Sequence, residues 1–209
     1  MINKKIILLD AGHGGFNEDG LYVTPGKRSP IWADGSQYFE GVGNRLIRRE
    51  IALMLEQKGI AYHYVNVGFV DIELSDRVNI ANAMCKAYGS HNCLLVSIHS
   101  NGFTNSAAEG WEVFTSPGET KSDKLAEILF ESMKQLFPDR KFRADYGDGD
   151  PDKEANFSMV VGPMCASVLS ENFFHTNEHE CRSILMTHEG RKKIARAHYT
   201  MIENFINEK

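Results

Sequence analysis

Three continuous apolar segments along the chain predict buried β-strands. Ile6–Leu9 ends at Asp10 and a glycine-rich turn, Cys93–Ile98 ends at a histidine, and Val168–Leu169 is closely followed by a carboxylate. Strands of a parallel sheet that is covered on both faces are apolar at successive positions, whereas half-exposed strands alternate. Trp111–Thr115 alternates and predicts a further strand.

Helical periodicity appears between and after these strands. In four segments apolar residues recur every three or four positions, which gives each segment one apolar face. The faces comprise Ile47, Ile51, Met54 and Leu55; Leu74, Val78, Ala81 and Cys85; Leu125, Ile128, Leu129, Met133 and Leu136, after Ser122 as the expected N-cap; and Ile194, Met201, Ile202 and Phe205. The alternation predicts a single α/β domain, with a mostly parallel or mixed central sheet and helices on both faces.

Two long segments interrupt this alternation, Phe16–Phe39 and Arg140–Asn156. Both are rich in Gly, Asp and Pro, and both are longer than ordinary connections between elements. Long loops in compact domains often carry function. We therefore expect these two segments to contribute to a site.

Length and composition exclude several classes of protein. The 209 residues fit one domain, and a formal net charge of -5 argues against a nucleic-acid-binding surface. Only Ile6–Leu9 follows Lys4 and Lys5, which is too short for a signal peptide, and no apolar run approaches a membrane span. The sequence predicts a chain made in the cytoplasm that does not enter a membrane.

The four cysteines form no CxxC pair. Cys85, Cys93, Cys165 and Cys181 are interpreted as reduced core thiols rather than as disulfide or metal-binding residues.

Two histidines stand where functional groups collect in open α/β sheets, just beyond the carboxyl ends of strands. His13 lies among glycines after the first apolar run, and His99 ends the second. Two imidazoles do not hold zinc tightly, and catalytic zinc sites usually add a third nitrogen or oxygen ligand and leave a position for water. The pattern therefore calls for a carboxylate.

Two carboxylates fit this chemistry. Glu40 follows the first long loop and precedes a predicted helix, whereas its rival Glu50 falls within that helix and is more simply a solvated residue. Glu171 lies at the tip of the last apolar strand, where nothing structural requires a charge. A general base fits the position of Glu171.

Several short motifs occur in order along most of the chain. They are Gly12–Gly15, Glu40 with Asn44, Arg77–Asn82, Ser97–Asn101, Glu154–Phe157 and Val168–Phe173. Together they resemble the motifs of the zinc-dependent N-acetylmuramoyl-L-alanine amidases of the amidase 3 type. Several motifs in one order are far more specific than any one of them.

The resemblance implies that His13, Glu40 and His99 bind one zinc ion and that Glu171 is the general base and acid. Zinc lowers the pKa of bound water from about 15.7 to about 7 and polarises a scissile carbonyl. Glu171 is then expected to take the proton of that water and pass it to the leaving amine. The expected reaction is hydrolysis of the amide bond between N-acetylmuramic acid and L-alanine in peptidoglycan.

Other positions concern the substrate or depart from the usual family pattern. Lys27 and Arg28, in the first long loop, are candidates to bind stem-peptide carboxylates, although a solvated surface loop is the slightly favoured explanation. Asn101 is a candidate to hold the substrate backbone, with loop capping as the alternative. Ala11 stands where many members carry proline, and Gly41 where lysine is common.

A second cluster of potential ligands follows Glu171. It comprises His175, Glu178, His179, Glu180 and Cys181. Histidines four apart on a helix face one another, as in some metal sites. Acidic residues at a helix start and exposed histidines explain the cluster without a metal, and we favour that interpretation.

Two alternative functions are consistent with the same candidate metal ligands and general base. One is a zinc peptidase that cuts within stem peptides, and the other is a catalytically silent peptidoglycan-binding module. The presence of all four chemical residues favours an enzyme. We expect a monomeric catalytic domain over residues 1–209 without a separate wall-binding domain, which acts on peptidoglycan or muropeptides after a phage-type release.

Overall fold

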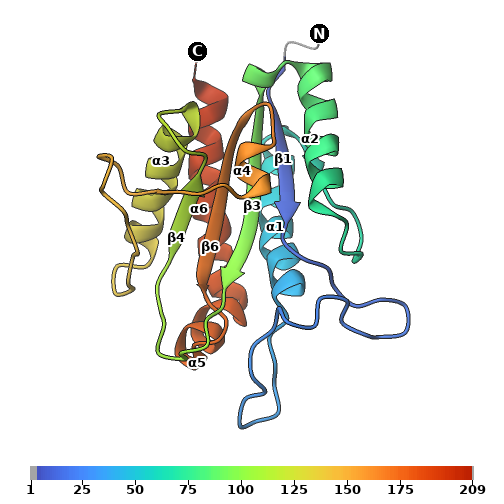
Figure 1. The fold of residues 1–209 in the computed structure, drawn as a ribbon, viewed down its shortest axis with the longest axis vertical. Coiled ribbons are helices and arrows are strands. Elements are labelled where there is room, and N and C mark those ends of the chain that lie inside the picture. The colour runs from blue at the N-terminus through green and yellow to red at the C-terminus, as the bar shows by residue number, and fades with distance from the viewer. Residues whose placement is uncertain (1–3, 209) are drawn as a thin grey trace.

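A mixed six-stranded sheet forms the centre of the computed structural model, which describes residues 4–208 (Figure 1). Its strand order is β2-β1-β3-β6-β4-β5. The strands are β1 (Ile6–Ala11), β2 (Ala61–Tyr64), β3 (Cys93–Asn101), β4 (Glu112–Thr115), β5 (Lys153–Glu154) and β6 (Ala166–Phe174). β2, β1, β3 and β6 are parallel, whereas β4 runs antiparallel to β6 and parallel to β5.

Helices cover both faces of this sheet, as the sequence predicts (Figure 1). The helices are α1 (Glu40–Gln57), α2 (Leu74–Tyr88), α3 (Lys121–Leu136), α4 (Ser158–Val161), α5 (Glu178–Glu180) and α6 (His188–Asn207), with a 3-10 turn η1 (Ser90–Asn92) and a π-helical turn η2 (Cys181–Leu185). α1, α3 and α6 share one core with alternate residues of the central strands. α2 and α4 share a second core with the intervening residues. The predicted α/β class is confirmed.

The alternation of side chains along the central strands explains these two cores. Ile7 and Leu9 of β1 point toward α1 and α6, whereas Ile6 and Leu8 point toward α2. All four are almost completely buried. A strand that is buried on both faces shows no alternation in sequence, which is why Ile6–Leu9 reads as one apolar run.

The expected N-cap of α3 is wrong by two residues. Thr120 caps the helix, because its Oγ1 accepts a hydrogen bond from the backbone nitrogen of Ser122, and Asp123 accepts from the backbone nitrogen of Thr120. Ser122 lies inside the helix, and its hydroxyl accepts from the backbone nitrogen of Ser167 on β6. This long-range bond to β6 is not visible in the local sequence.

The cysteines are free thiols, as expected. Cys85, Cys93 and Cys181 are buried, and Cys165 is partly buried. Between residues 4 and 208, no helix combines the length and apolar character needed to cross a bilayer.

Candidate active site

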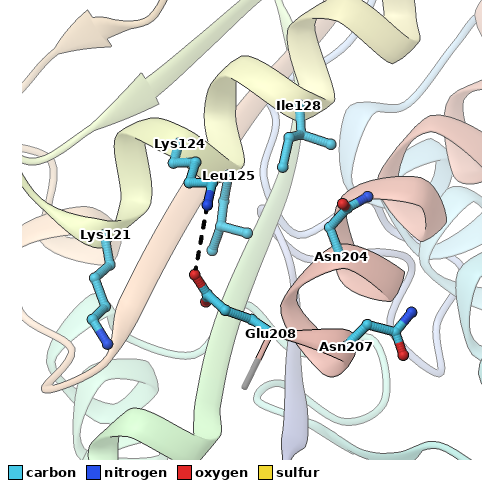
Figure 2. A pocket seen from close by; sticks show the side chains of 7 residues that line it. All are labelled: Lys121, Lys124, Leu125, Ile128, Asn204, Asn207 and Glu208. Atoms are coloured by element: carbon cyan, nitrogen blue, oxygen red, sulfur yellow. Dashed lines mark ion pairs between the residues drawn. The ribbon is translucent and has the colours of Figure 1, made fainter.

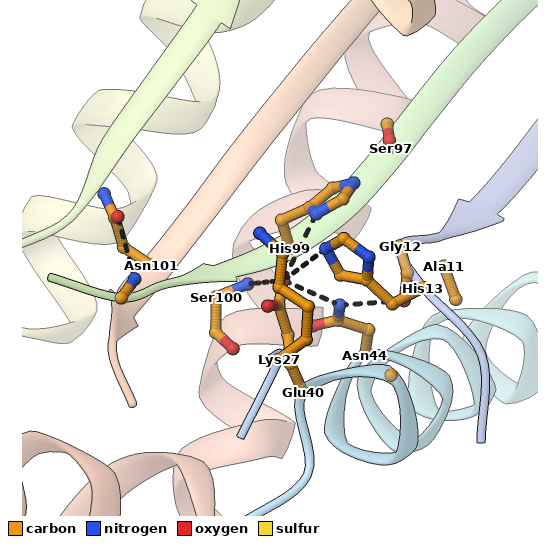
Figure 3. Close-up of polar contacts among 12 residues, drawn as sticks. Ala11, Gly12, His13, Lys27, Glu40, Asn44, Ser97, His99, Ser100 and Asn101 are labelled. Carbon is orange, nitrogen blue, oxygen red and sulfur yellow. Dashed lines mark hydrogen bonds and ion pairs between the residues drawn. The ribbon is translucent and has the colours of Figure 1, made fainter. Parts of the chain in front are cut away.

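The ends of β1 and β3 and the start of α1 bring His13, His99 and Glu40 together (Figure 3). Oε1 of Glu40 lies 3.4 Å from Nε2 of His13 and 3.2 Å from Nδ1 of His99. One potential ligand atom from each residue lies within 4.8 Å of the other two. In the part of the chain that the structure describes, this is the cluster that can hold a metal ion.

Glycines make this close approach possible. A Cβ atom on Gly12 would lie 2.1 Å from Cε1 of His99, so only glycine lets the His99 ring pack against the turn. His13 itself has a φ of 65°, which is uncommon for a residue with a side chain. A Cβ on Gly41 would lie 1.8 Å from the carbonyl oxygen of Gly14, so the lysine common in the family does not fit this loop path.

A buried ion pair fixes the end of β1 beneath the histidines. Nη1 of Arg77, on α2, donates to Oδ1 of Asp10 at 3.0 Å and to the carbonyl oxygen of Ala11 at 3.1 Å. Ser97 on β3 donates to the other oxygen of Asp10 at 2.7 Å. Asp10 and Arg77 are both buried. This network ties β1, β3 and α2 together next to the site.

Glu40 is ionised although it is buried. Burial by itself would raise the pKa of Glu40, but hydrogen bonds and charge interactions with His13 and His99 hold it well below its usual range. Oε1 also accepts from the backbone nitrogen of Ser100 and from Asn44. Oε2 is buried and has no hydrogen-bond partner. An anionic oxygen between two imidazoles fits a divalent cation, because two histidines and one glutamate form a common ligand set of catalytic zinc.

Glu171 lies beside this cluster on the neighbouring strand. It is the register partner of His99 across the parallel pair β3 and β6. Its Oε2 is buried without a hydrogen-bond partner. Burial raises the pKa of Glu171 to about 8, with His99 opposing and the charge of Glu40 adding to the increase. A dication near this carboxylate would lower that pKa.

Two openings flank the cluster. One opening has a volume of about 380 Å³. Its polar lining residues include Lys27, Arg28, Asn101, Glu171 and His175, and the rest of its wall is formed by Gly26, Ser100, residues 102–104 and Thr176. The other, of about 300 Å³, lies on the side of His13 and is lined by residues 71–74, Arg77 and His99. The first long loop therefore reaches the same cleft as Glu171.

Asn101 lines the cleft, but its side chain already has partners. Its Nδ2 donates to Glu112, and its Oδ1 accepts from the backbone nitrogen of Gly102 at 2.9 Å. The second contact is the loop-capping interaction that the sequence left open as an alternative.

The sequence interpretation did not identify Glu112 as a site residue. It is buried on β4 and accepts from Nε of Arg143 at 3.1 Å and from Nζ of Lys153 at 2.5 Å. Both cations belong to the second long loop, which thereby contacts the strand next to Glu171. The alternation of Trp111–Thr115 places Glu112 on the face opposite Trp111 and Val113, which from sequence alone predicts an exposed residue, so no local signal identified its buried position.

The second histidine cluster requires a correction. His179 is exposed as expected, but His175 is buried, with 4% of its surface accessible. Glu180 is also buried and accepts from the backbone nitrogens of Gly110 and Phe174, both at 2.9 Å. Within residues 4–208 the cluster does not form a second metal site. Burial lowers the pKa of His175, so its imidazole is neutral.

Glu50 and a pocket between α3 and α6 both lie outside the candidate metal centre. Glu50, the rival of Glu40, contacts Nε2 of His188 at 3.3 Å and is not part of the metal-binding cluster. A separate pocket of about 220 Å³ lies between α3 and the end of α6 (Figure 2), where Lys124 and Glu208 form an exposed ion pair. That pocket does not share lining residues with the cleft.

The fold and this cluster define a class of α/β hydrolases with a candidate metal centre at the carboxyl ends of the strands. Residues 7–204 match the family model described as N-acetylmuramoyl-L-alanine amidase. The AmiA amidase of Salmonella typhimurium is 27% identical to this chain, over 93% of the chain and 74% of that protein.

Two solved structures have the same fold. The N-acetylmuramoyl-L-alanine amidase of Clostridium difficile 630 superposes with a TM-score of 0.77 at 23% identity, with 99% of each chain covered. AmiC2 of Nostoc punctiforme superposes with a TM-score of 0.75 at 23% identity, with 100% of each chain covered.

The chain belongs to the N-acetylmuramoyl-L-alanine amidase family. The predicted family and the predicted enzyme class, a hydrolase that degrades cell-wall peptidoglycan, are thus confirmed.

Proposed function

We propose that the protein is a zinc-dependent amidase that cleaves the bond between N-acetylmuramic acid and L-alanine, with His13, Glu40 and His99 as the ligands of one zinc ion. The observation that carries this proposal is the convergence of the three side chains on one point from β1, α1 and β3. The buried, ionised Glu40 supports it, because its Oε1 lies between the two imidazoles and an anionic oxygen in that place suits a bound dication. Membership of the amidase family supports this choice of bond.

The chemistry that zinc supplies when bound is the acidification of a water molecule and the polarisation of the scissile carbonyl. Glu171 is proposed to accept the proton of the water on its carboxylate and to donate it to the departing amine of L-alanine. Two observations support this role: Glu171 is the strand partner of His99, and its carboxylate lines the cleft. Its raised pKa suits a group that both accepts and donates protons near neutral pH.

Substrate binding is proposed to use the cleft between the first long loop and β3. Lys27 and Arg28 line it and are exposed, so their cations are available to carboxylates of the stem peptide. Asn101 lines the same cleft and is proposed to contact the substrate backbone. Residues 1–209 are proposed to act as one catalytic domain on peptidoglycan or muropeptides.

Metal dependence and bond specificity are tested in one experiment. Elemental analysis of the purified protein should find about one zinc per chain, and a chelator should abolish lysis of purified sacculi until zinc is restored. Mass spectrometry of the products should then identify a new amino terminus at L-alanine. A new terminus elsewhere in the stem peptide would instead identify a zinc peptidase, and intact sacculi would identify a binding module.

The role of Glu171 is tested separately. Glu171→Gln removes the proton acceptor but preserves the shape of the side chain. The variant should retain its zinc and lose activity by roughly 10²–10⁴-fold, the usual contribution of a general acid or base. Activity close to that of the unmodified protein would rule out the assignment.

A further inference from the structure

His175 lies next to Glu40, the glutamate of the candidate metal centre, on the side of its Oε2. It follows β6, and its side chain is 4% exposed. Its Nδ1 lies 3.1 Å from the carbonyl oxygen of Ser100 and 4.0 Å from Oε2 of Glu40. Oε2 is the buried carboxylate oxygen without a hydrogen-bond partner. The imidazole is therefore next to the one part of Glu40 that its other neighbours leave unsatisfied.

The neighbours of His175 determine which ring nitrogen carries the proton. The carbonyl oxygen of Ser100, 3.1 Å away, can only accept, and it is closer than the Ser100 hydroxyl at 3.4 Å, so these contacts favour the tautomer with its hydrogen on Nδ1. The ring of Tyr38 stacks on the imidazole, with centroids 6.2 Å apart, and restricts its rotation. Nε2 faces Gly102, where a Cβ atom would lie only 2.6 Å away. His175 is not among the three residues that can hold the metal ion, whereas its Nδ1 lies close to Oε2 of Glu40.

We propose that His175 is a positioning residue, whose Nδ1–H stabilises Oε2 of Glu40 and keeps Oε1 directed toward His13 and His99. At 4.0 Å the contact is an interaction of a dipole with a charge rather than a full hydrogen bond. It is effective because both side chains are buried, and interactions in such surroundings are only weakly screened. Groups that orient a ligand in this way typically change metal affinity 10–100-fold.

This role rests on the proposed zinc site, and it differs from the role of Glu171. His175 lines the cleft wall, but the inference assigns its effect to Glu40 and not to the substrate. Its loss should therefore change zinc affinity even when no substrate is present.

The test compares His175→Leu with His175→Asn by competition for zinc against a chromophoric chelator. Leucine removes the donor, whereas the amide nitrogen of asparagine can occupy about the position of Nδ1. His175→Leu should bind zinc 10–100-fold more weakly, and His175→Asn should stay within about threefold of the unmodified protein. His179→Leu, at an exposed histidine, is the matched control and should not change the affinity.

Thermal unfolding of the metal-free proteins separates positioning from a general loss of structure. If His175→Leu does not fold, His175→Gln replaces it, because the longer amide does not reproduce the Nδ1 donor. A loss of affinity below tenfold in the folded variant, or an equal loss in His175→Asn, overturns the inference. If the unmodified protein binds no zinc, the proposed function fails and this inference fails with it; tight binding that His175→Leu leaves unchanged overturns this inference alone.

Discussion

Glu112 on β4 and Glu171 on β6 are register partners across an antiparallel strand pair, so their side chains project from the same face of the sheet. Arg143 and Lys153 form ion pairs with Glu112. The charge of Glu112 is one of the causes that raise the pKa of Glu171, although burial is the largest. The charge of Glu112 therefore influences the pKa of Glu171 next to the cleft.

Glu112→Gln should lower the pKa of Glu171. The substitution removes a neighbouring negative charge and leaves Arg143 and Lys153 unpaired nearby, and both changes favour the ionised form of Glu171. The acidic limb of the profile of kcat/KM against pH should therefore move to lower pH. Unfolding stability should fall by about 1 kcal/mol, since the partly exposed Arg143 and Lys153 lose a charged acceptor and solvent screens part of that loss.

The pH profile of amidase activity on soluble muropeptides checks this prediction. Glu119→Gln removes a charge from an exposed position and is the matched control. An acidic limb that stays in place in Glu112→Gln would show that Glu112 does not act on Glu171.

Glu40→Gln should separate metal binding from folding. In the metal-free protein His13 and His99 hold the pKa of Glu40 below its usual range, so the ionised carboxylate is stabilising and a neutral amide should lower the melting temperature. Zinc at a thousand times its dissociation constant should stabilise the unmodified protein by about 4 kcal/mol, because it binds only the folded state. The variant should lose this stabilisation.

Thermal melts with and without zinc measure both effects. Glu50→Gln is a sharp control, because Glu50 lies in the same helix and was the alternative ligand from sequence. Zinc stabilisation that survives in Glu40→Gln and disappears in Glu50→Gln would reverse the assignment.

Lys27 and Arg28 provide a test of substrate recognition. Lys27→Glu combined with Arg28→Glu should lower kcat/KM for muropeptides with free stem-peptide carboxylates by roughly tenfold, mainly through KM. The effect is moderate because both side chains are exposed and solvent screens their charges. The double variant Arg49→Glu with Lys58→Glu makes the same charge change at two exposed positions, one on α1 and one at its C-cap. Turnover that is equal in both double variants would exclude a role for the loop cations.

Arg77→Leu should destabilise the protein by about 3–5 kcal/mol, because it leaves the buried carboxylate of Asp10 without its cation. Adding Asp10→Asn should recover part of the loss, since a neutral amide can still accept from Ser97. Urea unfolding of both variants measures the difference. If the double variant is no more stable than Arg77→Leu, the unpaired charge is not the cause.

The parts of the site that could be predicted from sequence are those that depend on local pattern. His13 and His99 follow apolar strands, and the carboxyl ends of parallel strands meet at one edge of a sheet. Gly12 also carries a local signal, because the turn after β1 must let an imidazole pack against the backbone. The position of Glu40 was predictable as the point where a long loop gives way to a helix.

The parts that could not be predicted depend on long-range register. Glu112 faces Glu171 only because β4 runs antiparallel to β6, which no local pattern specifies. His175 reaches Glu40 only after an irregularity in the pairing of β3 with β6, where Phe173 adopts a φ of 62°. Phenylalanine gives no sequence signal for that backbone conformation, whereas glycine would have done so. The short strands β2 and β5 were not predicted either. None of their residues is fully buried, so they lack the apolar pattern of the central strands.

His198 on α6 should make stability depend on pH. Its Nδ1–H donates to the carbonyl oxygen of Ile194 and its Nε2 accepts from Ser170, both at 2.8 Å. Burial lowers the pKa of His198 to about 4 from 6.5, so the folded state resists a proton that the unfolded state accepts. The contribution to stability is complete above pH 6.5 and is lost as the pH falls toward 4, at about 1.4 kcal/mol per pH unit and about 3 kcal/mol in total.

Urea unfolding at several pH values between 4.5 and 7 tests this dependence. His198→Leu should have lower stability at pH 7, because Ser170 loses its acceptor, but its stability should fall less steeply with acid by about one proton. His179→Leu, at an exposed histidine, should keep the steep dependence. Equal slopes in His198→Leu and the unmodified protein would mean that other groups cause the acid sensitivity and that the buried imidazole does not contribute to it.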